Sequence, residues 1–80
     1  MLDNLISAAQ KGNIHITFKS LISGRDIREI YTLKGVDIPL NPNSEKIIFL
    51  HVNSGVYEDI QKDTITEWGL TRDHPNMKIA

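Results

Sequence analysis

The sequence predicts a small, mainly β protein in which five short antiparallel strands curl into an SH3-like or Sm-like barrel after one short N-terminal α-helix. Three observations carry this prediction. Apolar and polar residues alternate from Asn13 to Ser20, which is typical of a half-buried strand. The densest β-prone run, residues 46–52, is folded back by a turn at Asn53-Ser54-Gly55. The β-branched and aromatic stretch 64–68 supplies a further strand.

A short helix is predicted from Leu2 to Lys11. Lys11 suits the last turn of a helix, and Gly12 occupies the position where a left-handed residue commonly ends one. A helix of this length is marginal alone, so its apolar stripe must pack on the sheet. That stripe has the spacing i, i+3, i+4 and i+7: Leu2, Leu5, Ile6 and Ala9.

The run 46–52 carries apolar side chains on both faces, which predicts a strand covered twice, by the helix or by another subunit. One face of this run is expected to join one face of the strand at 13–20 in the barrel interior. The expected interior residues are Ile14, Ile16, Phe18, Ile48, Leu50 and Val52. The opposite face of the run carries Ile47, Phe49 and His51.

A second strand is predicted from Asp26 to Leu33, and the stretch from Lys34 to Glu45 is predicted to be a loop because it is rich in Pro, Asn and Gly. Loops of this length often carry function. Beyond Leu70 the periodicity is lost, so we expect one domain over residues 1–70 and a frayed C-terminal tail over 71–80. An open α+β sheet with the helix on one face is the alternative to the barrel. The barrel is favoured because closure best buries the inward side chains of short, bent strands.

Composition narrows the functional classes. The formal net charge of −1 gives no reason to expect a generic nucleic-acid binder. Charge is nevertheless uneven: residues 1–36 carry a net +2, residues 37–70 a net −4 and residues 71–80 a net +1. The absence of cysteine excludes disulfides and thiolate metal sites. The opening residues lack a basic signal region, and no apolar run approaches membrane-spanning length, so we expect a cytoplasmic protein.

Two segments, GNIHITFKSLISGRDIREIYTL and KIIFLHVNSGVYEDIQKDTITEW, resemble a family of small proteins of T4-like phages described as a WYL-like, Sm-type SH3 barrel. The shared pattern is a short helix and a Gly, a strand like Ile16-Thr17-Phe18, a Gly-containing turn, a strand ending in Thr32-Leu33 and a hairpin ending near Thr64-Ile65. It covers roughly residues 5–68. The resemblance implies a barrel and a phage origin, hence the host cytoplasm, but no particular activity. The family's hairpin often carries an aromatic-Arg signature, which Val56-Tyr57-Glu58-Asp59 replaces with acids.

No motif points to catalysis or to a cofactor. The three histidines, His15, His51 and His74, lack a second ligand at metal-binding spacing. Paired carboxylates perform acid–base chemistry only where burial raises one pKa. Four carboxylates near a turn are more typical of a negative patch that meets a basic partner. These four are Glu58, Asp59, Asp63 and Glu67.

The sequence therefore predicts a non-enzymatic protein-binding module without metal or cofactor, such as a phage factor that modulates a host or phage protein. An unpaired edge strand would also support a homo-oligomer. The predicted contact residues are Phe49, Tyr57, Glu58, Asp59 and Trp68. The alternative is a nucleic-acid-binding barrel that combines phosphate contacts with base stacking. Its predicted residues are Lys19, Arg25, Arg28 and Tyr31. A third hypothesis, an enzyme subunit or small-molecule site, requires a deep pocket with convergent polar groups.

Overall fold

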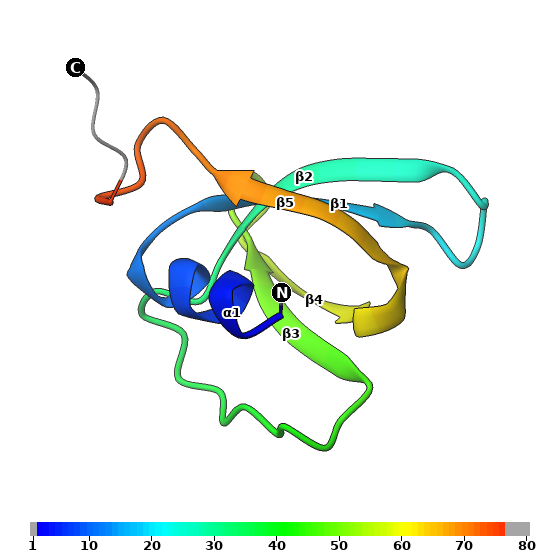
Figure 1. Ribbon diagram of the computed structural model, residues 1–80, viewed down its shortest axis with the longest axis horizontal. Helices are drawn as coiled ribbons and strands as arrows, with labels where there is room; N and C mark the ends of the chain where they lie inside the picture. The colour runs from blue at the N-terminus through cyan, green and yellow to red at the C-terminus, as the bar shows by residue number, and fades with distance from the viewer. Residues whose placement is uncertain (1, 77–80) are drawn as a thin grey trace.

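The computed structural model describes residues 2–76 and contains one helix and one five-stranded antiparallel sheet (Figure 1). The elements are α1 (Leu2–Lys11), β1 (Ile14–Lys19), β2 (Asp26–Thr32), β3 (Lys46–His51), β4 (Val56–Gln61), the 3-10 turn η1 (Lys62–Thr64) and β5 (Ile65–Leu70). Strand order is β4-β3-β2-β1-β5. β3 and β4 turn beneath β1, β2 and β5, so the sheet folds over itself (Figure 1). The predicted class, a mainly β, barrel-like fold with a short N-terminal helix, is confirmed.

One apolar core fills the space between the two halves of the sheet and the inner side of α1. Every strand and the helix contribute to it, because each presents one apolar face of the appropriate period. Burial of this shared face is the main source of stability for a domain of this size. The buried core residues are Leu5, Ala9, Ile14, Ile16, Tyr31, Leu33, Ile47, Phe49, Ile60 and Ile65.

The predicted face assignment of β3 is wrong. Ile47 and Phe49 point into the core, whereas Ile48 lies outside with 40% of its surface exposed. The pairing of β3 with β4 explains this orientation, because Ile47 lies opposite Ile60, the one buried residue of β4. The expectation that β3 is covered on both faces fails for the same reason. The outer face, predicted as interior through Ile48, Leu50 and Val52, is left partly open to solvent.

The two halves of the sheet meet at a short junction centred on Tyr31. β2 and β3 pair only through Tyr31 with His51 and Thr32 with Leu50. The Tyr31 ring packs between the two halves, with centroids 5.9 Å from Phe49 and 5.3 Å from His51. Its hydroxyl donates a 3.0 Å hydrogen bond to Glu58 Oε1 on β4. A single side chain therefore connects β2 to both strands of the lower half.

The carbonyls at the C-terminal end of α1 bind the end of β2. The last turn of a helix leaves its carbonyls without intrahelical partners. Here Ala9 O accepts the Leu33 N–H at 2.9 Å, and the Thr32 hydroxyl lies 3.1 Å from Gly12 O. The end of β2 thus caps the helix and fixes it against the sheet.

The segment after β5 is docked, which contradicts the predicted fraying for residues 71–76; residues 77–80 lie outside the described part of the chain. His74 is buried: its Nε2–H donates to Ala8 O at 2.8 Å, and its Nδ1 accepts the Asn76 N–H at 3.1 Å. Gly12 is needed for this close packing, because a Cβ there would lie 2.6 Å from Pro75 Cδ. The three described glycines with positive φ are Gly24, Gly35 and Gly55, so the predicted left-handed role of Gly12 is also wrong.

Replacing Tyr31 with Phe should lower the free energy of unfolding by about 1–2 kcal/mol, because a hydrogen bond to a carboxylate is lost while the ring is kept. Urea denaturation measures the change. Tyr57→Phe is the matched control, since Tyr57 is exposed, and it should alter stability by less than about 0.5 kcal/mol. Equal effects of the two substitutions would contradict a special role for the junction.

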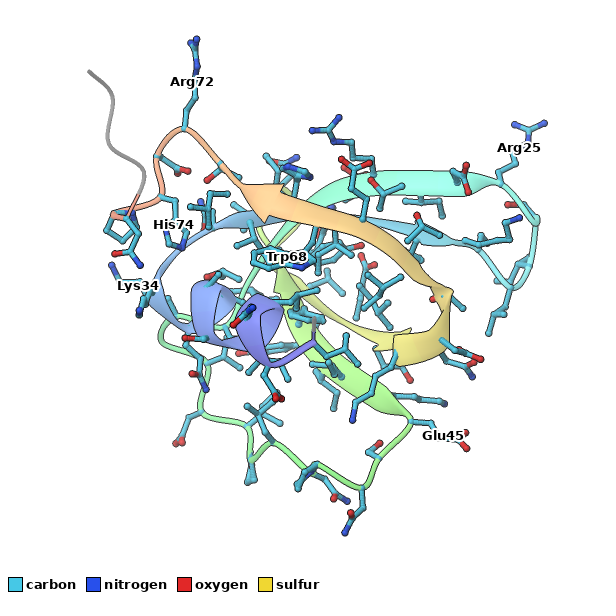
Figure 2. The ribbon with its side chains drawn as sticks, in the orientation of Figure 1. Arg25, Lys34, Glu45, Trp68, Arg72 and His74 are labelled. Carbon is cyan, nitrogen blue, oxygen red and sulfur yellow. The ribbon has the colours of Figure 1, made fainter. Side chains whose placement is uncertain are left out.

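Replacing His74 with Ala should cost about 2 kcal/mol, because it removes a buried ring that satisfies the Ala8 carbonyl. The neighbouring Arg72 extends away from the fold (Figure 2), so Arg72→Ala should change stability by less than about 0.5 kcal/mol. If His74→Ala and the wild type have the same midpoint of urea denaturation, the C-terminal segment is not part of the cooperative fold.

Candidate protein-interaction surface

The outer face of the β3–β4 hairpin is the most apolar part of the exposed sheet. Leu50 lies opposite Tyr57, and Ile48 lies opposite Asp59. Same-face neighbours on paired strands are close enough for their side chains to touch. Tyr57 is 53% exposed and Ile48 40%. We call this surface the hairpin face; it consists of Lys46, Ile48, Leu50, Tyr57, Asp59 and Gln61.

A hollow of about 210 Å³ continues the hairpin face toward α1 and the loop between β2 and β3. The hollow is formed by the loop residues 38–42 and 44, by Ile6 of α1 and by the adjoining ends of β3 and β4. Leu40, on its rim, is another exposed large apolar residue. The long loop, predicted as a carrier of function, therefore widens the apolar surface of the hairpin. We call this feature the loop hollow.

The hairpin face lies beside an open edge of the sheet. Within residues 2–76, β4 pairs only with β3 and β5 only with β1. The Lys46 ammonium lies 3.5 Å from the Asp59 carboxylate on the hairpin face, with both side chains more than half exposed. A pair this exposed contributes little to folding. It places a solvated charged pair at one end of the apolar surface.

The structure separates the predicted protein-contact residues. Tyr57 and Asp59 lie on the hairpin face. Phe49 is 0% exposed and belongs to the core, so its prediction as a contact residue is wrong. Glu58 faces inward and accepts the Tyr31 hydroxyl. Trp68 is half-buried against the core, between β5 and α1 in Figure 2.

The predicted nucleic-acid residues are also separated. Lys19, Arg25 and Arg28 are exposed along the β1–β2 hairpin, with Arg25 at its far end (Figure 2). Tyr31 is fully buried and cannot stack on a base, so its predicted role is wrong. What remains is a set of three cations interspersed with Asp26 and Glu29, without an aromatic platform.

A cluster of polar side chains around His51 lies beside Tyr31, where β2 meets β3. His51 sits between two carboxylates, with Nε2 3.7 Å from Glu29 Oε1 and Nδ1 3.6 Å from Glu58 Oε2. His51 Nδ1 also forms a 2.6 Å hydrogen bond with the Ser54 hydroxyl. Burial, and then the hydrogen bond to Glu58, raises the pKa of Tyr31. The two carboxylates approach opposite nitrogens of the His51 ring. Residues 2–76 contain no group of three or more His, Asp and Glu side chains arranged to hold a metal ion.

His15, on the outer face of β1, lies opposite Gly69 and packs over it. Burial lowers the pKa of His15, and the nearby Arg28 charge lowers it further, while Glu67 acts in the opposite direction. His15 also lines a shallow hollow with Arg28, Arg72 and other residues, on the outer side of β1 and β2. Its role is to cover a glycine that has no side chain of its own.

Sequence reasoning missed Ile48, Leu50 and Leu40 as surface residues. The signal that would have identified Ile48 and Leu50 lies in β4, where Tyr57, Asp59 and Gln61 share one side and Ile60 lies on the other. The polar side of β4 faces solvent. The pairing register places Ile48 and Leu50 of β3 on that same face.

The lowered pKa of His15 makes stability depend on pH. A basic group with a folded-state pKa below its ordinary value of 6.5 favours the unfolded state as pH falls. The free energy of unfolding should therefore drop from neutral pH to about pH 5, and His15→Gln should reduce this drop. Urea denaturation at several pH values tests the difference. The hydrogen bond donated by the Thr71 hydroxyl is the main reason that the pKa of Asp73 is lowered. Protonation of Asp73 therefore changes stability only below its ordinary pKa of 3.8, which lies outside this pH window. Parallel pH profiles for variant and wild type would contradict the assignment.

No helix within residues 2–76 has the length and apolar character needed to span a membrane. Comparison of the chain with protein-family models, with curated proteins and with solved structures yields no match.

Proposed function

We propose that this protein is a small non-enzymatic protein-binding module that contacts its partner through the hairpin face and the rim of the loop hollow. The observation that carries the proposal is the cluster of exposed Ile48 and Tyr57 with half-buried Leu50 at an open sheet edge. Exposed apolar residues that cluster on one surface often mark an interaction site.

The chemistry of this surface favours a particular kind of partner. Tyr57 offers a large, half-exposed ring, and aromatic residues of this kind commonly dominate binding energy. Asp59 lies on this face 3.5 Å from Lys46, and residues 37–70 as a whole carry a net −4. We therefore expect a partner surface with an apolar anchor and a basic border, because complementary charge speeds association and selects the partner.

The resemblance to phage barrel proteins fits a factor that modulates a host or phage protein. This origin remains a proposal that rests on the residues that carry the resemblance. A nucleic-acid-binding barrel is the less favoured function, because its candidate cations lack an exposed aromatic residue.

The double substitution Ile48→Thr and Tyr57→Thr should weaken partner binding strongly and leave the fold intact. Threonine keeps the preference for strand structure while removing the apolar contact area. The tagged wild type and the variant are used to capture proteins from expressing or infected cells, and captured proteins are identified by mass spectrometry. The affinity of a purified partner should fall at least ~10-fold for the variant.

The matched control is the pair Arg25→Ala and Arg28→Ala, on the β1–β2 hairpin away from the hairpin face. These substitutions should leave protein capture unchanged. Binding to an oligonucleotide that weakens steeply with salt and disappears in the arginine variant would instead support the nucleic-acid function. Partner affinity that is unchanged by the double threonine substitution would exclude the hairpin face as the site.

A further inference from the structure

The hollow on the outer side of β1 and β2 has a volume of about 460 Å³ and is formed by four separate segments of the chain. Its polar lining includes His15 of β1, Arg28 of β2, Asn53 of the turn after β3 and Arg72 of the segment after β5. The hollow shares no lining residue with the hairpin face or the loop hollow. Its volume lies in the range of roughly 300–1,000 Å³ that is typical of small-molecule sites. We call this feature the basic hollow.

The fold holds the walls of the basic hollow in place without help from a ligand. The Val52 N–H donates to Ile30 O at 3.0 Å, which holds the turn after β3 against β2. The Thr71 hydroxyl donates to Asn13 O at 2.9 Å and so ties the segment that carries Arg72 to the start of β1. A site with a preformed backbone loses little conformational entropy when it binds a ligand.

Two guanidinium groups on the basic hollow lack a carboxylate partner. Arg28 and Arg72 are exposed, and neither forms a salt bridge within residues 2–76. The Arg72 side chain extends into solvent beyond the end of β5 (Figure 2). Among the described residues that line the hollow, Glu29 is the only acid, and its Oε1 lies 3.7 Å from His51 Nε2. The hollow therefore carries an excess of positive charge that the fold does not neutralise.

His15 responds to this excess charge. Burial lowers the pKa of His15 and the Arg28 charge lowers it further, while Glu67 on β5 acts in the opposite direction. His15 Nδ1 has no hydrogen-bond partner within residues 2–76, so protonation there breaks no hydrogen bond of the fold. An anion bound beside Arg28 offsets the guanidinium charge and favours the protonated ring. The His15 imidazole is therefore a built-in reporter of an anion in the hollow.

We propose that the basic hollow binds the phosphate group of a small phosphorylated organic molecule, with Arg28 and Arg72 as its two charged contacts. A guanidinium group pairs with phosphate through parallel hydrogen bonds. A phosphate monoester offers three acceptor oxygens and close to two negative charges near neutral pH, which matches two guanidinium groups. A carboxylate, with one charge and two oxygens, satisfies only one of them.

The remainder of the hollow accommodates the organic part of the ligand. Ile30 and Leu70 are half-buried and supply apolar surface to the lining. Because the hollow is shallow, the phosphate contacts supply most of the affinity. This inference does not depend on the proposed function, because no residue of the hairpin face lines the basic hollow.

Titration of isotope-labelled protein with phenyl phosphate, followed by nuclear magnetic resonance, tests the site. The amide signals of Gly69 and Thr71 should shift in a saturable manner near neutral pH. Arg28→Ala with Arg72→Ala should weaken binding at least ~10-fold, because charge-assisted hydrogen bonds are lost. Both arginines are exposed, so this variant should keep the wild-type urea midpoint.

Two controls separate the site from general attraction of anions. Arg25 is an exposed cation on the same hairpin that does not line the basic hollow, so Arg25→Ala should bind phenyl phosphate like the wild type. Benzoate should bind more weakly than phenyl phosphate because it offers one charge and two oxygens. Phenol, which has the ring without the anion, should cause no saturable shift.

The His15 ring supplies a readout that a merely structural role of the arginines would not change. Phenyl sulfate serves as the probe here, because its charge stays constant in the range where His15 titrates. With this probe bound, His15 should titrate at a higher pH than in the free protein, and affinity should rise as pH falls. His15→Gln should abolish that rise.

The absence of a saturable shift with phenyl phosphate overturns the inference, as does equal affinity of the wild type and the double arginine variant. Equal affinity for benzoate overturns the ligand class. Tighter binding of a single-stranded oligonucleotide, weakened equally by Arg25→Ala, would assign these cations to a nucleic-acid backbone instead. Ile48→Thr with Tyr57→Thr should bind phenyl phosphate like the wild type, so this inference and the proposed function fail separately.

Discussion

A two-pair junction between β2 and β3 is the constraint on which the rest of this barrel depends. With so short a ladder, backbone hydrogen bonds alone hold the two halves of the sheet together weakly. Tyr31 compensates with both parts of its side chain. Its ring fills the space between Phe18 and Phe49, and its hydroxyl donates a hydrogen bond to the Glu58 carboxylate. Because the hydroxyl is satisfied, the ring is buried without leaving a polar group unpaired.

The same junction explains why apolar residues remain outside. Tyr31, Phe49 and Ile47 fill the interior of the lower half, so no space is left for Ile48 or Leu50. Strand alternation then forces both residues to the opposite face. An apolar outer face is therefore the direct consequence of a β3 strand that is apolar at consecutive positions. A sequence under selection for solubility alone would place polar residues there, as the outer side of β1 does with His15, Thr17 and Lys19.

How far the sequence predicts this structure depends on the range of the interactions involved. β1 was predictable because its alternation has a single interpretation, and α1 because its stripe has helical spacing. The face of β3 was ambiguous, since both parities are apolar and only the pairing with β4 decides between them. The docking of His74 on Ala8 joins residues 66 positions apart and has no local signal. The sequence also marks Gly12 as the residue that follows the helix, but the need for glycine there comes from the close approach of Pro75, which depends on that same long-range contact.

The open edge of the sheet adds a restriction on how this molecule associates. Exposed edge strands invite pairing with any extended chain, and charged side chains discourage it. β4 carries two acidic residues, Glu58 and Asp59, at its centre, and charged residues on an edge strand disfavour strand addition. Side chains that project from the sheet, such as the half-exposed ring of Tyr57, are therefore better suited to a selective contact than the backbone of this edge.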